Sequence, residues 1–423
     1  MESMDTNTGA QLQIRFITKQ EIYAVPSAPF AVPQQISNTQ LNALLNELIK
    51  ESLETTAPIE FDFLIEGQLL RLTLLEHIKD FNISTETTID VEYIQRTAAP
   101  EPENALSHDD WVAGIKVADK WILTGCYDHS VNIWSTHGKH EVVAREHTNL
   151  VKAVAWLKHS DPTGGFITVS HDLTGILWEW KPEDKSPTPV TVLRGHERAV
   201  DSIGISPNSE RIATGAWDTY LKIWSASLDI SDNGEPQSKR QKSTKISHIP
   251  SRTPIHTLKG HKENIVSVLW MDSQLICTAS MDHTIKLWDT ELCGLQNEIV
   301  AEKAFLGASW SNLARSIIAC SADRHIRLYD PRSTEGSICK TVFTSHSLWV
   351  SAVTWSHTQE YMFMSGSYDE CVKLWDSRSP KAPLYDLTGH QGKVLCVDWS
   401  NPQLLVSGGT DNSVHIFKNR HNS

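Results

Sequence analysis

The sequence lacks any apolar run that approaches the roughly 20 residues of a membrane-spanning helix. Its first residues also lack the basic start and the apolar core of a secretory signal peptide. Its seven cysteines are odd in number and include no CxxC pair, so the sequence predicts neither a zinc site nor a disulfide framework. These absences indicate a soluble protein that is not secreted and keeps its thiols reduced.

A GxxxxGK[ST] loop is also missing, so ATP chemistry is not expected and the sequence predicts no cofactor. Apolar material is plentiful, with 40% hydrophobic residues in a chain of 423, which is enough for sizeable cores. Acidic side chains predominate in the first hundred residues, which hold 14 acidic and 6 basic groups in a chain of net charge −13. Such a segment repels nucleic-acid phosphates and suits a basic or metal-bearing partner.

Tryptophan is frequent, with 15 residues against 8 tyrosines, and most of it belongs to a repeat. An Asp stands six residues before an aromatic residue seven times, and successive Asp residues lie 44, 46, 64, 41, 46 and 42 positions apart. Five of these six spacings fit a repeat of about 40–46 residues, and the remaining one indicates an insertion. The seven pairs are Asp128/Trp134, Asp172/Trp178, Asp218/Trp224, Asp282/Trp288, Asp323/Tyr329, Asp369/Trp375 and Asp411/Phe417.

Each repeat reads as four short strands. A His, usually after Gly as in Gly195-His196, stands upstream of most of the Asp residues, and β-rich runs such as Arg211 to Gly215 lie between them. The repeats resemble the WD-repeat family, and Trp288-Asp289 and Trp375-Asp376 are literal WD dipeptides. The resemblance implies a mainly β fold, a seven-bladed WD40 β-propeller over residues 105–418, in which each blade covers its neighbours.

The recurring polar residues of the repeats have a catalytic and a structural interpretation. His261, Ser280 and Asp282 have the side-chain types of a hydrolase triad. The arrangement recurs around the ring, whereas an active site is needed once, so we interpret these groups as hydrogen-bonded structural tetrads and expect no enzyme. The residues assigned to the tetrads are His196, Asp218, Trp224, His261, Asp282, Trp288, His390 and Asp411.

The end of the repeat region poses a problem of closure. The last repeat stops at Phe417 after only three strands, so a closed ring needs a strand from before Ser107. The nearest segment, Ala98 to Glu103, contains two prolines, which disfavour strand pairing. The prediction therefore treats residues 97–104 as a linker and leaves the closure of the ring unexplained.

Residues 11–96 follow a different pattern, after a stretch over residues 1–10 that we expect to be disordered. The pattern indicates a small α+β domain in the order ββαββ, with a short helical turn before the last strand, which is the order of a ubiquitin-like β-grasp. The expected elements are strands at Leu12–Ile17 (with Ile17 as one imperfect outer position), Phe61–Ile65, Gln68–Leu72 and Thr88–Ile94, a helix capped by Ser37 or Thr39, and a capping box from Thr73 and Glu76.

No Gly-Gly tail follows this domain, so a docking module is favoured over conjugation to a lysine. Phe61 to Arg71 and Ile89 to Arg96 resemble WD-repeat ribosome-biogenesis factors with an NLE-type N-terminus, the family of WD-repeat subunits of pescadillo–block-of-proliferation complexes. The resemblance implies a scaffold for pre-rRNA processing and maturation of the large (60S) subunit. Its implied partners are pescadillo, the propeller of the block-of-proliferation protein and the pre-60S particle.

In this family the ubiquitin-like domain gives one glutamate to the metal-ion-dependent adhesion site of the AAA-type ATPase midasin. The family's hydrophobic-Ser-Ser/Thr-Glu loop matches Ile83-Ser84-Thr85-Glu86. The resemblance thus implies that Glu86, with Ser84 and Thr85 beside it, is a ligand to midasin's Mg²⁺, while the chain holds no metal of its own. Spacing alone favours another interpretation, in which Glu86 is an ordinary solvated carboxylate.

The long spacing of the third repeat contains a polar insertion, residues 226–252, which we expect to be flexible. Lys239, Arg240 and Lys242 within it form a short basic cluster, which reads either as a nuclear-localisation signal or as part of a solvated linker. The family carries a basic run in this insertion, so the resemblance implies work in the nucleus, in both nucleolus and nucleoplasm.

A second function stays open, that of a substrate receptor of a cullin ubiquitin ligase. Trp375-Asp376-Ser377-Arg378 matches the WDxR box of such receptors, although arginine is common at this place in WD repeats. Partner binding in either function needs exposed anchors on the propeller. Trp217, Trp349 and Tyr368 are candidates, with burial between blades as the other interpretation.

Overall fold

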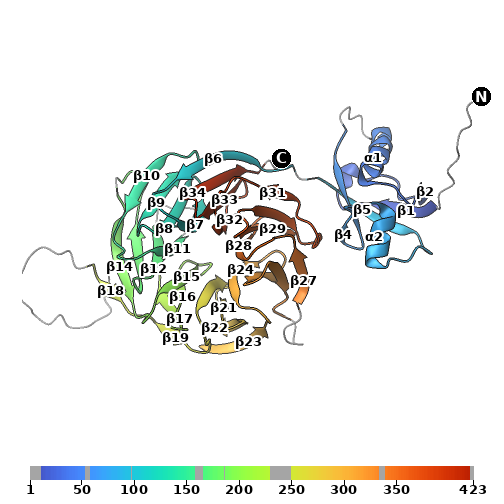
Figure 1. Cartoon of the computed structure of the whole chain (residues 1–423). Helices are drawn as coiled ribbons and strands as arrows, with labels where there is room; N and C mark the ends of the chain where they lie inside the picture. The colour runs from blue at the N-terminus through green and yellow to red at the C-terminus, as the bar shows by residue number, and fades with distance from the viewer. Residues whose placement is uncertain are drawn as a thin grey trace, which may run out of the picture. The chain divides into compact units, whose positions relative to one another are not determined.

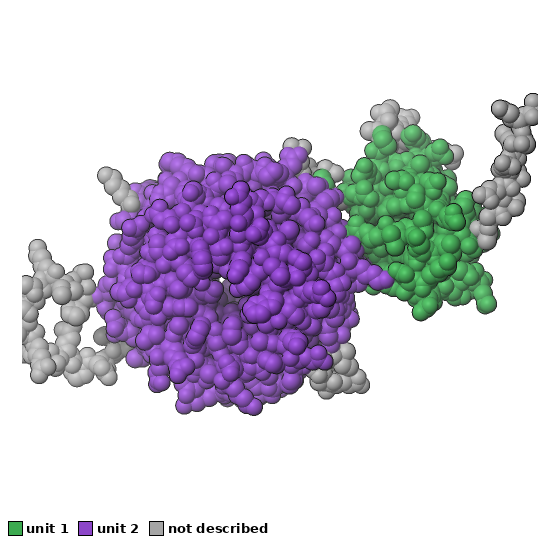
Figure 2. Space-filling model, in the orientation of Figure 1, with its two compact units in different colours: residues 1–98, 421–423 green, residues 99–420 purple. Residues whose placement is uncertain are grey.

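A computed structural model describes residues 11–52, 58–96, 98–157, 165–184, 186–228, 249–332 and 339–419. The chain divides into two compact units, one formed mainly by Met1–Ala98 and the other by Ala99–Arg420, which Figure 2 shows in different colours. None of the helices among the described residues is long and apolar enough to cross a membrane.

The described residues of the first unit form a five-stranded sheet with two α-helices and one 3-10 helix. Its strand order is β2-β1-β5-β3-β4, in which β1 and β5 are parallel and the other neighbours are antiparallel. The small α+β domain that the sequence predicts is confirmed. Its elements are β1 (Gln11–Ile17), η1 (Glu21–Tyr23), β2 (Phe30–Pro33), α1 (Asn38–Ser52), β3 (Phe61–Ile65), β4 (Gln68–Leu69), α2 (Leu74–Phe81) and β5 (Ile89–Gln95).

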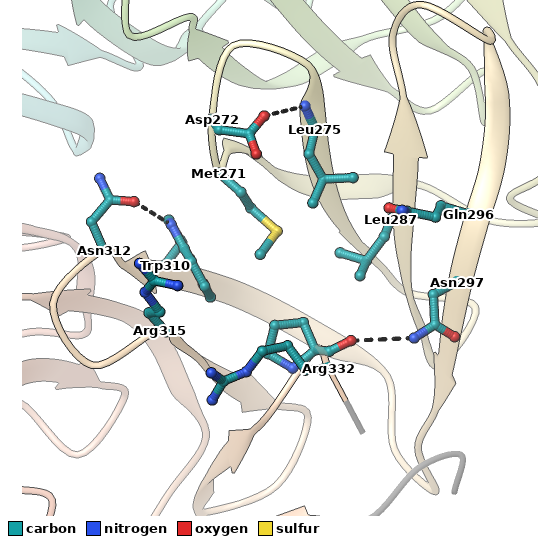
Figure 3. A pocket seen from close by; sticks show the side chains of 11 residues that line it. Met271, Asp272, Leu275, Leu287, Gln296, Asn297, Trp310, Asn312, Arg315 and Arg332 are labelled. Atoms are coloured by element: carbon teal, nitrogen blue, oxygen red, sulfur yellow. Dashed lines mark hydrogen bonds between the residues drawn. The ribbon is translucent and has the colours of Figure 1, made fainter. Parts of the chain in front are cut away.

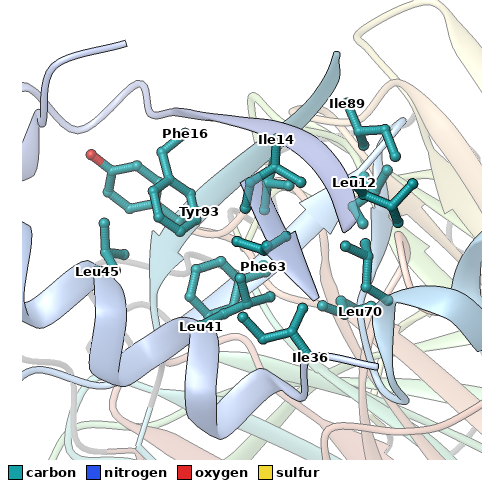
Figure 4. Close-up of a cluster of buried hydrophobic side chains, with 14 of the residues drawn as sticks. Leu12, Ile14, Phe16, Ile36, Leu41, Leu45, Phe63, Leu70, Ile89 and Tyr93 are labelled. Carbon is teal, nitrogen blue, oxygen red and sulfur yellow. The ribbon is translucent and has the colours of Figure 1, made fainter. Parts of the chain in front are cut away.

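Alternation along the sequence decides which side chains of this sheet are buried. Leu12, Ile14 and Phe16 of β1 are buried, and the residues between them are exposed. Helix α1 places Leu41 and Leu45 on the same core, and Figure 4 shows these side chains gathered between the helix and the sheet. Burial of a side chain of this size stabilises the fold by about 1.5–3 kcal/mol.

Both helices begin at a predicted cap. The Ser37 hydroxyl accepts the Gln40 amide N–H at 3.4 Å, and the Gln40 side-chain oxygen accepts the Ser37 N–H at 2.9 Å. Thr73 and Glu76 form the predicted capping box at the start of α2. These local bonds set where each helix begins, because they satisfy backbone N–H groups that have no partner inside the helix.

The second unit is a ring of sheets, which we number as blades 1 to 7 in chain order. Figure 1 shows them around a common centre, and Figure 2 shows the surface hollowed there. The described residues of this unit pair into seven sheets, and the four strands that make up each blade pair antiparallel with their neighbours. The mainly β fold built from WD repeats is confirmed.

The blades have these strands. Blade 1 has β7 (Val112–Ala118), β8 (Trp121–Cys126), β9 (Val131–Ser135) and β10 (His140–Ala144); blade 2 has β11 (Val151–Trp156), β12 (Phe166–Ser170), β13 (Thr174–Glu179) and β14 (Thr188–Arg194); blade 3 has β15 (Val200–Ile205), β16 (Arg211–Ala216), β17 (Leu221–Ser225) and β19 (His256–Leu258). Blade 4 has β20 (Ile265–Trp270), β21 (Leu275–Ser280), β22 (Thr284–Asp289) and β23 (Gly294–Val300); blade 5 has β24 (Phe305–Ser311), β25 (Ser316–Ser321), β26 (His325–Tyr329) and β27 (Cys339–Thr344). Blade 6 has β28 (Val350–Trp355), β29 (Met362–Ser367), β30 (Val372–Asp376) and β31 (Tyr385–Leu387); blade 7 has β32 (Val394–Asp398), β33 (Leu404–Gly409), β34 (Ser413–Lys418) and β6 (Glu101–Ser107).

Blade 7 takes its outermost strand from the beginning of the unit. Strand β6 pairs antiparallel with β34, and the two lie next to each other in Figure 1. Residues 101–104, which the sequence analysis assigns to a linker, therefore belong to the propeller. The two prolines are compatible with this strand because Pro100 precedes it, while Pro102 lies on an edge strand where the pairing register shifts.

The insertion of the third repeat is described only at its ends. Residues 229–248 lie outside the described part of the chain, and Lys239, Arg240 and Lys242 are among them. After this stretch, β18 (Ser251–Arg252) adds to the edge of blade 2 by parallel pairing with β14. The last two residues of the insertion predicted to be flexible are therefore part of a sheet.

The predicted tetrads are chains of hydrogen bonds within single blades. In blade 3, His196 Nδ1 lies 2.7 Å from the Asp218 carboxylate, and His196 Nε2 lies 2.7 Å from the Thr214 hydroxyl. The same hydroxyl accepts the Trp224 indole N–H at 2.8 Å. Because these polar atoms are shielded from water, each needs a partner inside the protein, and the chain supplies it.

Blade 4 shows why the triad interpretation is wrong. His261 lies 2.8 Å from Asp282 and 2.7 Å from the Thr278 hydroxyl, which accepts the Trp288 N–H at 2.8 Å. Ser280 has no bond to the histidine and donates to a backbone carbonyl instead. Burial acts to raise the pKa of Asp282, but the hydrogen bonds that it accepts, first from His261, hold that pKa well below its ordinary value.

Three blades depart from the complete chain. In blade 1, His108 Nδ1 lies 3.4 Å from the Leu106 carbonyl oxygen instead of contacting Asp128, and Trp134 donates its indole N–H to His108 Nε2 at 3.1 Å. In blade 7, His390 lies 2.9 Å from Asp411, but Phe417 stands where other blades have a tryptophan, so the indole donor is missing. Blade 5 has no histidine at this place, and Arg327 donates to Asp323 at 2.7 Å. The aspartate is thus retained in each case, and its partner varies.

Replacing Leu106 tests the closure of the ring. Leu106 of β6 is 3% exposed and packs with side chains of blades 1 and 7. Leu106→Ala should lower the free energy of unfolding of the propeller by about 2–5 kcal/mol, because it leaves a cavity under the closing strand. Urea unfolding followed by tryptophan fluorescence measures the change. Leu292→Ala, at a side chain 82% exposed, is the matched control, and an equal effect of both substitutions would contradict the assignment.

Replacing Asp282 tests the structural role of the tetrads. Asp282→Ala leaves the buried His261 without its carboxylate partner, so the free energy of unfolding should fall by about 3 kcal/mol. Asp282→Asn should recover part of this loss, because the amide oxygen still accepts a hydrogen bond. Asp184→Ala, at an exposed aspartate, is the control in the same urea titration. A loss no larger than that of the control would refute the structural role.

Candidate functional site

The predicted loop is a short exposed segment that is anchored at both ends. Helix α2 ends at Phe81 and is capped by Asn82, whose left-handed backbone (φ 52°) turns the chain away from the helix axis. Ile83 then packs against the domain core, and Ile89 is buried at the start of β5. Residues 84–88 between these two anchors are all exposed, so the fold presents Ser84, Thr85 and Glu86 to solvent.

The Glu86 carboxylate differs from Asp90 and Glu92 in its contacts with the described part of the chain. The Arg15 guanidinium donates to both Asp90 oxygens at 2.7 and 2.8 Å and holds the pKa of that carboxyl below its ordinary value. Glu92 lies 3.5 Å from the Lys19 ammonium. Among the described residues of this unit, no hydrogen bond or ion pair engages the Glu86 carboxylate, whereas its backbone N–H donates to the Ser84 hydroxyl at 3.4 Å.

A hollow of about 390 Å³ lies beside this loop. Ile17, Ile83 and Ile89 supply apolar lining, Ser84 lines it from the loop, and Asp90 is on its acidic side. The alternation of β1 places residue 17 on the exposed side of the strand, where a polar residue is expected. An isoleucine stands there instead and is 37% exposed. The hollow was not predicted from the sequence, but the apolar Ile17 at an outer strand position was a signal of it.

The chemistry available here is that of a single oxygen ligand. One carboxylate on a loop cannot form a metal site alone, since Mg²⁺ takes six oxygen ligands, but it can fill one open position on a cation held by another molecule. In the described residues, one group of metal-ligand side chains lies close together: His390, Asp411 and His415. His390 already contacts Asp411 through Nδ1 and the Ser407 hydroxyl through Nε2, so this group belongs to the tetrad of blade 7.

The three aromatic residues predicted as partner-binding anchors are not buried between blades: Trp217 and Trp349 are exposed and Tyr368 is half-buried. Trp217 is 48% exposed and donates its indole N–H to Asp201 at 2.8 Å. Trp349 is 51% exposed and lies 6.1 Å from the half-buried Tyr368, measured between ring centroids. The three side chains stand in loops at the ends of strands, where they are open to contact with another molecule.

The arginine of the WDxR match is held inside its own blade. Arg378 donates to both carboxylate oxygens of Asp376, at 2.9 and 2.7 Å, and its guanidinium lies 4.4 Å from the centre of the Tyr361 ring. Its side chain is 21% exposed. This geometry accounts for an arginine at this position by packing within the blade.

Comparison with known proteins adds to these observations. The sequence model of the NLE (NUC135) domain matches residues 12–78. The model described as WD domain, G-beta repeat matches five segments, residues 101–135, 187–225, 252–289, 337–376 and 381–418. The first of these segments begins at β6, in agreement with its place in the propeller.

Curated relatives cover nearly the whole chain. A ribosome biogenesis protein WDR12 homolog of Drosophila virilis is 48% identical over 412 residues, which are 97% of this chain and 96% of the relative. The homolog of Aedes aegypti is 47% identical over 411 residues, with the same shares, and that of Drosophila simulans is 47% identical over 418 residues, 99% of this chain and 98% of the relative. With an NLE domain followed by WD repeats and this degree of identity, the chain belongs to the family of ribosome biogenesis protein WDR12 homologs.

Proposed function

We propose that this protein is a non-enzymatic scaffold in ribosome biogenesis, required for pre-rRNA processing and for maturation of the large (60S) subunit. Its propeller docks on the propeller of the block-of-proliferation protein, in a complex with pescadillo on the pre-60S particle. Its N-terminal domain offers Glu86 to the ATPase midasin. Two kinds of observation support the proposal: the relatives are named ribosome biogenesis proteins, and Glu86 is an exposed carboxylate that no described residue engages.

The single observation that carries the proposed contact is that no described cation pairs with the Glu86 carboxylate. Asp90 and Glu92 are neutralised by cations of their own domain, so either would have to break an ion pair before binding a metal. Glu86 has no such pair, and a hard Mg²⁺ with an open octahedral position takes a carboxylate oxygen readily. The anchored ends of the loop reduce the conformational entropy that the contact costs.

This arrangement allows the ATPase to release the complex from the pre-60S particle by mechanical force. The propeller grips the particle through its exposed surface, and the N-terminal domain is a separate compact unit through which the ATPase can pull. The ATP chemistry belongs to midasin. The hollow beside the loop provides space for an apolar side chain of the ATPase next to the metal contact.

Nuclear import is part of the proposal. Lys239, Arg240 and Lys242 supply the basic cluster that an import receptor recognises, and we place the work of the protein in the nucleolus and nucleoplasm. Assembly of ribosomal particles on nascent pre-rRNA requires this location.

The second candidate, a cullin-ligase receptor, has less support. Arg378 is engaged by Asp376 and packs on Tyr361, so its presence needs no ligase to explain it. Affinity purification distinguishes the two functions, because recovery of pre-60S particles supports the scaffold and recovery of a cullin with its adaptor supports the receptor.

Replacing Glu86 tests the metal contact. Glu86→Ala should weaken binding to the midasin adhesion domain at least about 30-fold, because it removes a charged ligand of the metal. Calorimetry with the full chain in the presence of Mg²⁺ measures this binding. Glu47→Ala, at an exposed glutamate of α1, is the matched control and should bind like the unchanged protein. Equal binding by the Glu86 variant, or undiminished binding after removal of Mg²⁺, would show that the site assignment is wrong.

Replacing the basic cluster tests nuclear import. A chain with Ala at Lys239, Arg240 and Lys242 should shift from nucleus to cytoplasm as a fluorescent fusion, because the import receptor loses its cationic contacts. The nuclear-to-cytoplasmic ratio of fluorescence measures the shift.

The control for this experiment changes the same number of charges elsewhere. Lys139, Lys181 and Lys262 are exposed on the propeller, and their joint replacement by Ala should leave the distribution unchanged. If both triple variants stay in the nucleus, the cluster is not the import signal.

A further inference from the structure

A pocket of about 820 Å³ opens between blades 4 and 5. Its lining comes from the turns β20–β21 and β24–β25, from β22 and β23, and from the residues that follow β26. Figure 3 shows Met271, Leu275 and Leu287 of blade 4 on one side, opposite Trp310 and Arg315 of blade 5. The volume falls within the range typical of ligand sites in proteins.

The pocket lies beside a tryptophan that is less buried than its counterparts. Trp310 is half-buried, whereas the tryptophans at the same place in blades 2, 4, 6 and 7 are all buried. Trp156 and Trp270 occupy the same place in the innermost strands of blades 2 and 4, are buried, and donate their indole N–H to the preceding blade, to Lys116 and Gly204 carbonyl oxygens. Trp310 is half-buried and donates instead to the Asn312 side chain in its own turn, at 2.7 Å. The indole therefore does not close the space between blades 4 and 5.

The interior of the pocket is apolar. Met271 and Leu287 are buried at its base, and Leu275 and Trp310 are half-buried on its walls. Leu313, in the same turn as Asn312, is 49% exposed. An apolar side chain entering this space removes apolar surface from water on both sides of the contact, at about 25 cal/mol per Å².

The rim of the pocket carries two arginines and one carboxylate, in a protein whose net charge is −13. Arg315 is exposed, and among the described residues no carboxylate pairs with it. Arg332 donates to Asp330 at 2.9 Å but keeps 64% of its side chain exposed. The acidic residue of the rim, Asp272, is occupied by backbone N–H groups of its own turn, including that of Leu275 at 2.8 Å.

We propose that this pocket binds an extended segment of a partner protein in which a bulky apolar side chain stands next to a carboxylate. The apolar side chain enters the space over Met271 and Leu287, and the carboxylate pairs with Arg315. This site goes beyond the contact of Glu86 with the ATPase and is independent of it, since it lies in the other unit of the chain.

The chemistry of the pocket favours a peptide over a nucleic acid. A strand of RNA needs several cations along its backbone and exposed aromatic faces for its bases. This rim offers two arginines, one of them already paired, and its indole is half-buried. A peptide that carries one apolar anchor and one carboxylate matches both parts of the site.

Selection from a library of random 12-residue peptides displayed on phage, against the full chain, tests this proposal. The enriched peptides should combine tryptophan, phenylalanine or leucine with a neighbouring Asp or Glu. Fluorescence anisotropy with the best labelled peptide should then give a dissociation constant at least about tenfold higher for Arg315→Asp than for the unchanged protein. Aspartate is chosen because residue 315 has a left-handed backbone (φ 48°), which this residue type tolerates.

Control variants keep the outcome unambiguous. Arg198→Asp reverses the charge of an exposed arginine in blade 3 and should leave the dissociation constant unchanged, as should Glu86→Ala. Trp310→Ala should also weaken binding, and if it unfolds the chain, the result for Arg315→Asp decides. The proposal is overturned if no peptide is enriched, if the enriched peptides bind the Arg315 variant equally well, or if a labelled 12-nucleotide RNA binds at this site more tightly than the best peptide.

Discussion

Contact between neighbouring blades is the constraint on which the rest of the propeller depends. A blade of four strands has two faces, and each face is covered by one of the two neighbouring blades in the ring. The last contact, between blades 7 and 1, joins residues from the two ends of the unit: Leu106, Val112 and Ile115 pack with Val406 and Ile416. Pairing of β6 with β34 holds these ends together, so a single edge strand secures a ring of more than three hundred residues.

The same constraint explains how polar groups are used in the two units. Burial between blades forces histidine, hydroxyl and aspartate side chains to bond one another, and in blade 3 this places both ring nitrogens of His196 at 2.7 Å from a partner. These bonds satisfy the polar atoms that the packing of the blades shields from water. On the small N-terminal unit, the loop that carries Glu86 lies outside the core and leaves its carboxylate open. Partner recognition is therefore expected at side chains that lie outside the packed cores and are exposed to solvent.

The pocket between blades 4 and 5 is such a place within the propeller. Blade 5 has no histidine in its tetrad, and the Trp310 indole turns to its own Asn312 rather than to the preceding blade. Blade 5 therefore lacks the His–Asp hydrogen bond found within other blades, and it lacks the indole hydrogen bond that blades 2 and 4 make to the preceding blade. A repeat that differs from the others can thus serve a role of its own while the ring keeps its shape.

Local patterns in the sequence were sufficient to predict strands β1, β3 and β5, the four-stranded repeats and the capping box at Thr73, and they left Ser37 or Thr39 as the cap of α1. These features depend on residues that are close along the chain, and alternation or capping chemistry reveals them directly. The loop before β5 was inferred from the family resemblance. Tertiary structure alone decided that residues 101–104 complete blade 7, that Thr278 rather than Ser280 serves the tetrad of blade 4, and that a pocket opens beside Trp310. Each of these outcomes depends on which surfaces the closed ring brings together across long stretches of chain, and no local pattern records that geometry.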